Sequence, residues 1–113
     1  QREAMARILA AFVQARGRPA IACGDANASP LSEVHRVLQA GGLQDAWEQA
    51  GWGLGNTFPS RTLYLLGVPV LPQWSTRIDY VLHTPEWQAL QARTARPDGV
   101  SDHRGVWVQL GWR

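Results

Sequence analysis

The sequence predicts an α/β (α+β) layered domain, and three observations support this class. Apolar residues recur at helical spacing from Arg2 to Arg16, which indicates an amphipathic helix. The short apolar run Ala20–Cys23 follows, bounded by Pro19 and Gly24, and is typical of a buried strand. A second helical pattern comes next, and the remainder consists of short strand-like segments. This order predicts a domain in which helices and strands form packed layers.

The composition bounds the kind of protein. The chain has 113 residues, which suits one domain or a part of one, and 45% of them are apolar. Charged residues make up 18%, so the composition excludes a disordered chain. The net charge of +2 comes from arginine alone among the cations, and it is too small to indicate nucleic-acid binding by itself.

The first helix ends at Gly17, and Pro19 prevents its continuation. Cys23 is the only cysteine, which excludes an internal disulfide and a cysteine-rich zinc site. Its apolar surroundings predict a small buried core residue and not a nucleophile. The expected apolar face of the helix consists of five residues, namely Met5, Ile8, Leu9, Phe12 and Val13.

The second helix is expected from Leu31 to Ala40, with Ser29 as its N-cap and Pro30 at its first position. Two glycines then stop it, and Leu43–Ala50 is expected to add one or two helical turns.

Five further segments complete the prediction. Asn56–Phe58 is expected to be a short strand, and Leu63–Leu71 a loop that faces a partner. Arg77–His83 alternates apolar and polar residues, which predicts a strand. Trp87–Ala95 is expected to be a strand, although its Gln and Ala content is also compatible with a helix, and Gly105–Leu110 is the final strand.

Polar side chains follow the first predicted strand. Asp25 and Asn27 lie in the sequence Gly24-Asp25-Ala26-Asn27, where open α/β sheets place their functional sites. Both side chains can face one pocket at this spacing, and they offer a charged acceptor and an amide. An ordinary turn is the alternative, because turns favour Asp and Asn for their own reasons.

Two later segments also carry polar groups. Asp79 interrupts an apolar strand, where a buried carboxylate requires a partner, although alternation also permits a solvent-facing position. Ser101, Asp102 and His103 precede the last strand. His103 can act as an acid, a base or a donor near neutral pH, and Asp102 offers the oxygen ligands that Mg²⁺ or Mn²⁺ prefers. A polar turn with an exposed histidine is the alternative.

The three segments in this order resemble the C-terminal half of the endonuclease/exonuclease/phosphatase (DNase I-like) superfamily. The stretches Gly53–Pro59 and Arg77–Tyr80 are similar to a bacterial subgroup in which some members carry membrane-anchoring N-terminal helices, so a longer protein containing this chain could be membrane-anchored. The resemblance implies that residues 1–113 form a single partial domain, the C-terminal half of a layered α/β sandwich. Its sheet is expected to be mixed and mostly antiparallel, with helices on one face. It also implies a metal-dependent hydrolase that cleaves phosphodiesters or phosphomonoesters.

The resemblance assigns roles to matched positions. Asp25 corresponds to the residue that activates the attacking water, and Asn27 to the residue that binds the scissile phosphate. Asp79 corresponds to the carboxylate that pairs with the catalytic histidine, His103, which also contacts the phosphate. From its own position just before the predicted strand end, Arg77 is a further candidate for binding the phosphate, and a surface ion pair is the alternative.

The resemblance also implies a cofactor and partners. Asp102 corresponds to a carboxylate at a Mg²⁺ (or Mn²⁺) site, and the N-terminal half of the family's domain supplies a glutamate ligand that cannot be placed in this chain. The expected partners are a phosphate-ester substrate, for which nucleic acid is one candidate, the N-terminal half itself, and a second copy through an exposed sheet face. A truncated, non-catalytic remnant is the main alternative. A serine hydrolase using Ser101 is a weaker one, because neighbouring residues on one turn do not easily form a triad.

The other two histidines are expected to be structural. His35 lies in the second predicted helix and is expected on its solvated face, whereas His83 is expected to cap the strand that contains Asp79. Trp52, Phe58 and Trp74 are candidates for a substrate groove, with core packing the favoured alternative for Phe58.

Overall fold

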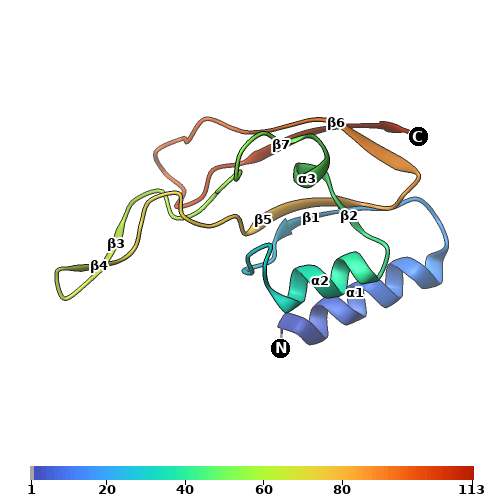
Figure 1. The fold of residues 1–113 in the computed structure, drawn as a ribbon, viewed down its shortest axis with the longest axis horizontal. Helices are drawn as coiled ribbons and strands as arrows, with labels where there is room; N and C mark the ends of the chain where they lie inside the picture. Colours follow the sequence, from blue (N-terminus) through green and yellow to red (C-terminus); the bar gives the residue numbers. More distant parts are fainter. Residues whose placement is uncertain (1) are drawn as a thin grey trace.

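The computed structural model describes residues 2–113 as a layered α/β arrangement with two long helices on one side of a sheet (Figure 1). The helices and strands, in chain order, are α1 (Arg2–Arg16), β1 (Ile21–Asp25), α2 (Glu33–Ala40), β2 (Gln44–Asp45), α3 (Ala46–Ala50), β3 (Leu63–Leu65), β4 (Val68–Leu71), β5 (Asp79–His83), β6 (Trp87–Thr94) and β7 (Val106–Trp112).

The central sheet has the strand order β1-β5-β2, and both pairings are antiparallel. Helices α1 and α2 cover one of its faces, and the antiparallel pair β6–β7 lies on the opposite side together with α3 (Figure 1). The third strand pair, β3–β4, projects from one end of the molecule (Figure 1). The predicted α/β class, with helices on one face, is therefore confirmed.

The core lies between the two long helices and the sheet. Strand β5 contributes Tyr80 and Leu82, because alternate residues of a strand point to the same face. The helices and the loop after α2 contribute aliphatic residues, including Val13, Leu38 and Leu43. Since Tyr80 and Leu82 face the helices, the alternating residues Asp79, Val81 and His83 face the opposite layer.

Helix α1 buries a different stripe from the one predicted. Its buried residues are Ala6, Ala10 and Val13, so small side chains allow α1 to approach α2 closely. The larger residues Met5 and Phe12 are mostly exposed, as is Ile8 between them. Of the predicted apolar face only Val13 is fully buried, and the described residues leave the rest of that stripe uncovered.

Helix α2 begins later than predicted. Its N-cap is Ser32, whose hydroxyl oxygen accepts a hydrogen bond from the backbone N–H of His35 at 3.3 Å. The predicted cap, Ser29, instead accepts from Leu31 N–H at 3.3 Å in the preceding turn. The helix ends at Ala40, as predicted.

Three segments differ in detail from the prediction. Residues 43–50 form the short strand β2 as well as the single helix α3. Asn56–Phe58 contributes only an isolated bridge, between Phe58 and Thr76. Leu63–Leu71 is a β-hairpin and not a loop, whereas the last three predicted strands correspond to β5, β6 and β7 within a few residues.

Strand β1 is more exposed than its apolar sequence predicts. It lies at the end of the sheet, and the Cys23 side chain points to the face that the helices do not cover. Cys23 is therefore exposed, and the prediction of a buried core residue was wrong within residues 2–113.

None of the described helices has the length and apolarity needed to cross a membrane.

Leu43 provides a test of the core, since its side chain is only 1% exposed at the centre of the helix–sheet contact. We expect Leu43→Ala to lower the free energy of unfolding by about 2–5 kcal/mol, because it removes buried methyl groups and leaves a cavity. Urea denaturation measures this change. The matched control is Leu31→Ala at a 97% exposed position, which should stay within about 0.5 kcal/mol of the wild type.

Candidate active site

Two aspartates lie directly opposite each other on neighbouring strands of the central sheet. The antiparallel register of β1 and β5 places Asp25, the last residue of β1, opposite Asp79, the first residue of β5. Side chains at opposed positions of antiparallel strands lie about 5 Å apart on one face. Two carboxylates at that spacing repel each other unless a positive or donating group lies beside them.

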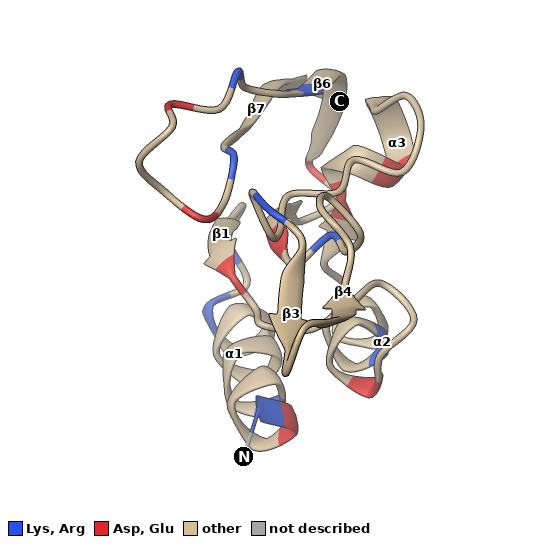
Figure 2. Ribbon diagram, turned by 90° about the vertical axis from the view of Figure 1, so that its left-hand side faces the viewer, with Lys and Arg blue, Asp and Glu red and all other residues tan. Residues whose placement is uncertain are grey.

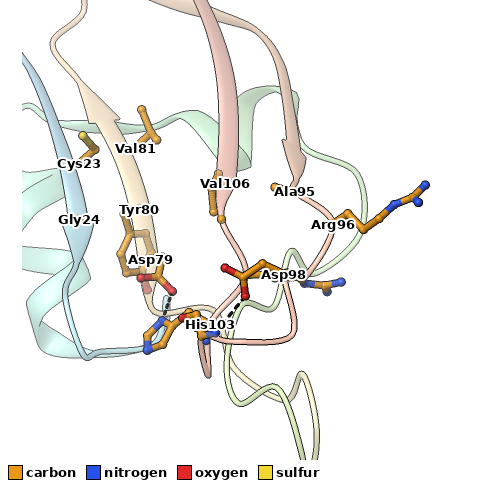
Figure 3. A pocket seen from close by; sticks show the side chains of 13 residues that line it. Cys23, Gly24, Asp79, Tyr80, Val81, Ala95, Arg96, Asp98, His103 and Val106 are labelled. Carbon is orange, nitrogen blue, oxygen red and sulfur yellow. Dashed lines mark hydrogen bonds and ion pairs between the residues drawn. The ribbon is translucent and has the colours of Figure 1, made fainter.

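His103 supplies that group from the loop between β6 and β7. Its Nδ1 lies 2.7 Å from Asp79 Oδ2 (Figure 3), and its Nε2 lies 3.7 Å from Asp25 Oδ2. Three segments that are distant in the sequence therefore meet at one imidazole. They border a cavity of about 560 Å³ between β1, β5 and the start of β7.

Backbone hydrogen bonds hold the histidine loop against the segment before β3. Arg104 N–H donates to Thr57 O at 3.0 Å, and Ser60 N–H donates to Asp102 O at 2.9 Å. The Phe58 ring lies 4.8 Å from the imidazole, centroid to centroid, and limits its movement on one side. The position of His103 is thus fixed by the backbone hydrogen bonds of its two chain neighbours, Asp102 and Arg104.

Ser101 has a structural role in this loop. Its hydroxyl oxygen accepts a hydrogen bond from the backbone N–H of His103 at 3.1 Å. No hydrogen bond joins this hydroxyl to the imidazole among residues 2–113. The arrangement gives no support to a serine hydrolase.

Asn27 lies beside Asp25 in a turn with left-handed backbone geometry. Its φ is +53°, a conformation that asparagine adopts more readily than most residues. The backbone N–H of Asn27 donates to Asp25 Oδ1 at 2.7 Å, which fixes one carboxylate oxygen and leaves Oδ2 toward His103. The Asn27 side chain is exposed, and only its backbone N–H contacts this carboxylate among the described residues.

Tyr80 ties this turn to strand β5. Its buried hydroxyl donates toward the carbonyl oxygens of Ala28 at 2.6 Å and Arg77 at 3.0 Å. Burial is the main reason that the pKa of Tyr80 is raised, so the hydroxyl stays protonated and able to donate. The turn that carries Asp25 and Asn27 is thereby linked to the residue that precedes Asp79 by two positions.

The environment of His103 favours its protonated form. Partial burial lowers the pKa of His103, but the hydrogen bond to Asp79 and the negative charges of Asp79, Asp25 and Asp102 outweigh burial and raise it. An imidazolium between carboxylates can donate from Nε2 to an anionic ligand while Nδ1 remains bonded to Asp79.

The carboxylates around His103 have the chemistry of a divalent-cation site. Asp25, Asp79 and His103 offer potential ligand atoms within 4.8 Å of one another. Asp102, the predicted metal ligand, extends a 73% exposed side chain whose Oδ1 lies 3.7 Å from His103 Nε2. Because Nδ1 is engaged by Asp79, the oxygens of Asp25 and Asp102 are the donors that suit a hard cation such as Mg²⁺. The residues present fit part of such a site.

Arg77 is the predicted site residue that the structure does not bring to this group. Its side chain is only 5% exposed, and its Nη1 donates to Asp45 Oδ2 at 2.8 Å. Its second nitrogen lies 4.0 Å from Glu48 Oε2. The expectation that Arg77 contacts the substrate does not fit this arrangement, because its guanidinium is committed to a buried carboxylate.

His35 belongs to the same buried cluster. Its side chain is 3% exposed and its Nε2 lies 2.8 Å from Asp45 Oδ2, so the prediction of a solvated residue was wrong. His83 is also buried and hydrogen-bonds to Gln49 and Thr84. The sequence feature that could have indicated this buried cluster is Asp45, the N-cap residue of α3. Its carboxylate accepts a hydrogen bond from Trp47 N–H at 2.9 Å.

Comparison with known proteins identifies the family. Residues 1–103 match the profile described as the Endonuclease/Exonuclease/phosphatase family. The chain belongs to this family. The match confirms the resemblance predicted from the sequence. A search of curated proteins found no match.

Solved structures of the endonuclease/exonuclease/phosphatase family share the fold. The chain is similar to a mannosyl-6-phosphatase, Bt3783, from Bacteroides thetaiotaomicron, with a TM-score of 0.73, 21% identity and 98% of this chain covered. A Bacteroides vulgatus endonuclease/exonuclease/phosphatase aligns with a TM-score of 0.72, 21% identity and the same coverage. A family protein from Beutenbergia cavernae aligns over 95% of this chain at 26% identity, with a TM-score of 0.64. The chain spans 46%, 45% and 30% of these three structures, respectively.

The buried Asp45 cluster predicts a dependence of stability on pH. Burial raises the pKa of Asp45, but the hydrogen bond from His35 and the charge and hydrogen bond of Arg77 outweigh burial and lower it below its ordinary value of 3.8. A lowered pKa means that the ionised carboxylate stabilises the fold above pH 3.8, and that this contribution is lost as the pH falls through the folded-state value. We expect Asp45→Asn to flatten this acid transition in thermal-unfolding scans, and an unchanged transition would contradict the assignment.

Arg77→Met tests the same cluster from its cationic side. We expect a loss of about 3–5 kcal/mol in the free energy of unfolding, since a buried carboxylate loses its permanent cation. Arg36→Met is the matched control, because Arg36 forms only an exposed pair with Glu33 and should change stability by less than about 1 kcal/mol. Urea denaturation at neutral pH distinguishes the two.

Proposed function

We propose that this chain supplies Asp25, Asn27, Asp79 and His103 to the metal-dependent hydrolysis of phosphomonoesters or phosphodiesters. The observation that carries the proposal is the meeting of β1, β5 and the β6–β7 loop at one imidazole, with Asp79 at 2.7 Å and Asp25 at 3.7 Å. Hydrolysis of a phosphate ester needs an activated water and donors for the charge that develops on the phosphoryl oxygens. This arrangement offers both kinds of group.

His103 is the donor in the proposed reaction. Asp79 accepts a hydrogen bond from Nδ1–H, which orients the ring. The Nε2–H group then points toward the side where Asp25 lies. A phosphoryl oxygen bound there would receive a charge-assisted hydrogen bond that strengthens as negative charge develops. Asp79 is therefore a positioning residue that acts through the imidazole.

Asp25 is the group that activates water. Its Oδ1 accepts the Asn27 N–H, so Oδ2 remains to accept a proton from a water molecule that attacks phosphorus. The bond from the water oxygen to phosphorus forms as the ester bond to the leaving oxygen breaks. The 41% exposed side chain of Asp25 gives solvent direct access to this oxygen.

Asn27 is proposed to bind the phosphate. Its exposed amide lies one turn from Asp25 and offers N–H donors without adding charge. The hydrogen bond from Tyr80 to the following carbonyl holds this turn in place. A neutral donor beside two carboxylates can contact an anionic oxygen without the repulsion that a third acid would cause.

Mg²⁺ or Mn²⁺ is the proposed cofactor, and Asp102 is the residue of this chain that would hold it. A bound divalent cation supplies charge neutralisation at the phosphate and lowers the barrier to attack. The chain spans less than half of the first two similar structures, so the remaining ligands are expected outside residues 1–113. The phosphatase among its structural neighbours supports a phosphomonoester as the first substrate to assay.

Asp25→Asn and His103→Gln test the proposed roles. We expect each to reduce kcat for p-nitrophenyl phosphate or bis-p-nitrophenyl phosphate by about 10²–10⁴-fold, the range for a group that transfers or donates a proton in the transition state. Circular dichroism should show an unchanged fold. Asp98→Asn is a control, since Asp98 lies on the same cavity and bonds only to backbone N–H groups of its own loop. Wild-type turnover in either site variant would contradict the mechanism.

Chelation tests the cofactor. We expect EDTA to abolish hydrolysis and added Mg²⁺ or Mn²⁺ to restore it, because the carboxylates otherwise repel the anionic substrate. Ca²⁺ at the same ionic strength controls for general charge screening. A folded protein that hydrolyses neither ester with any of these cations would favour the alternative of a non-catalytic remnant.

A further inference from the structure

The hairpin β3–β4 stands apart from the rest of the molecule. It projects from one end of the long axis and lies beyond the layered body (Figure 1). Its large apolar residues are exposed, with exposed fractions of 38% for Leu63, 64% for Tyr64 and Leu65, 96% for Leu66, 60% for Val68 and 55% for Val70. Such an apolar projection is unfavourable in water and indicates a surface that binds something.

The hairpin carries no charge. None of the residues from 62 to 76 is Asp, Glu, Lys or Arg, and Figure 2 shows both strands in the colour of uncharged residues. Its strands also lack the alternation of apolar and polar residues that marks a sheet with one face in water. Both faces are apolar, so the chemistry suits a medium that surrounds the hairpin and not a partner on one side.

The tip strengthens this interpretation. The two residues that connect β3 to β4, Leu66 and Gly67, both have positive φ, at +51° and +79°. Two-residue turns of this type favour Asn, Asp or Gly at these positions. Leucine is unfavourable at this position for two reasons. Its backbone must adopt a positive φ, and its apolar side chain is 96% exposed to water. An apolar environment at the tip would offset the second cost.

The base of the hairpin differs from its tip. Arg61 is exposed immediately before β3, and the guanidinium of Arg104 lies 4.5 Å from the centre of the Trp74 ring after β4. Cations and amphipathic aromatic rings at one level, below an apolar tip, match the order of a lipid surface from anionic headgroups to acyl chains. The short strands suit shallow insertion, since their unpaired edges could not lie in the hydrocarbon layer.

We propose that the β3–β4 hairpin inserts its tip into the surface of a lipid bilayer, with Arg61 and Trp74 at the headgroup level. The proposal is independent of the hydrolytic function, because it rests on the hairpin alone. A second copy of the chain, packed hairpin to hairpin, is the competing occupant of this surface.

Co-sedimentation with vesicles tests the proposal. We expect the protein to bind vesicles of phosphatidylcholine and phosphatidylserine, and Leu65→Asp/Leu66→Asp to reduce the partition coefficient about tenfold or more, because two apolar side chains no longer enter the bilayer. Aspartate tolerates positive φ, so the turn is retained. Leu31→Asp, at a 97% exposed position outside the hairpin, is the matched control and should bind as the wild type does.

Leu66→Asn separates lipid binding from folding. Asparagine is favoured in this turn, so thermal stability should be unchanged or higher, whereas vesicle binding should fall. Hydrolysis of a soluble ester should be unaffected by either hairpin variant. Absence of wild-type binding to vesicles, or equal binding by Leu65→Asp/Leu66→Asp, would overturn the proposal. So would a lipid-free dimer, seen by light scattering, that the same variant dissociates.

Discussion

The hydrogen bond between His103 Nδ1 and Asp79 Oδ2 joins two layers of the molecule at the point where Asp25 also lies. One partner comes from the central sheet and the other from the β6–β7 loop, so the bond forms only if the layers are in register. The sheet register in turn places the two aspartates opposite each other. Electrostatics then makes the imidazole necessary, because two opposed carboxylates repel in the absence of a donor between them.

A buried set of charges supports this group of residues from the segment just before β5. Asp45 binds Arg77, and Arg77 lies two residues before Asp79. The carbonyl of Arg77 accepts a hydrogen bond from Tyr80, which also holds the turn that carries Asn27. The start of β5 is therefore fixed by contacts with Asp45 of β2, with the turn after β1 and with Tyr80 of β5 itself. Rigidity of this kind is what a site needs if its groups are to be oriented before the substrate binds.

Local chemistry explains what could be predicted from the sequence. Asp25 and Asn27 follow a strand-like apolar run, and the proximity of Asp25 to Asp79 and His103 follows once the family resemblance orders the strands. The fates of His35 and Arg77 depend on Asp45, which is 10 and 32 residues away, respectively, and no local pattern connects them. Cys23 and the large apolar residues of α1 were misjudged for another reason. Hydropathy indicates which side chains gain stability from burial. Only the packing of residues 2–113 shows whether another element covers them.

The position of β1 at the end of the sheet has a consequence for control of the site. Its outer edge carries backbone amides and carbonyls that no described strand pairs with, and Asp25 is its last residue. Any strand that docked there would stiffen the backbone beneath this carboxylate, whereas a bare edge lets it fray. A strand added at this edge would therefore also order the backbone that carries the Asp25 carboxylate.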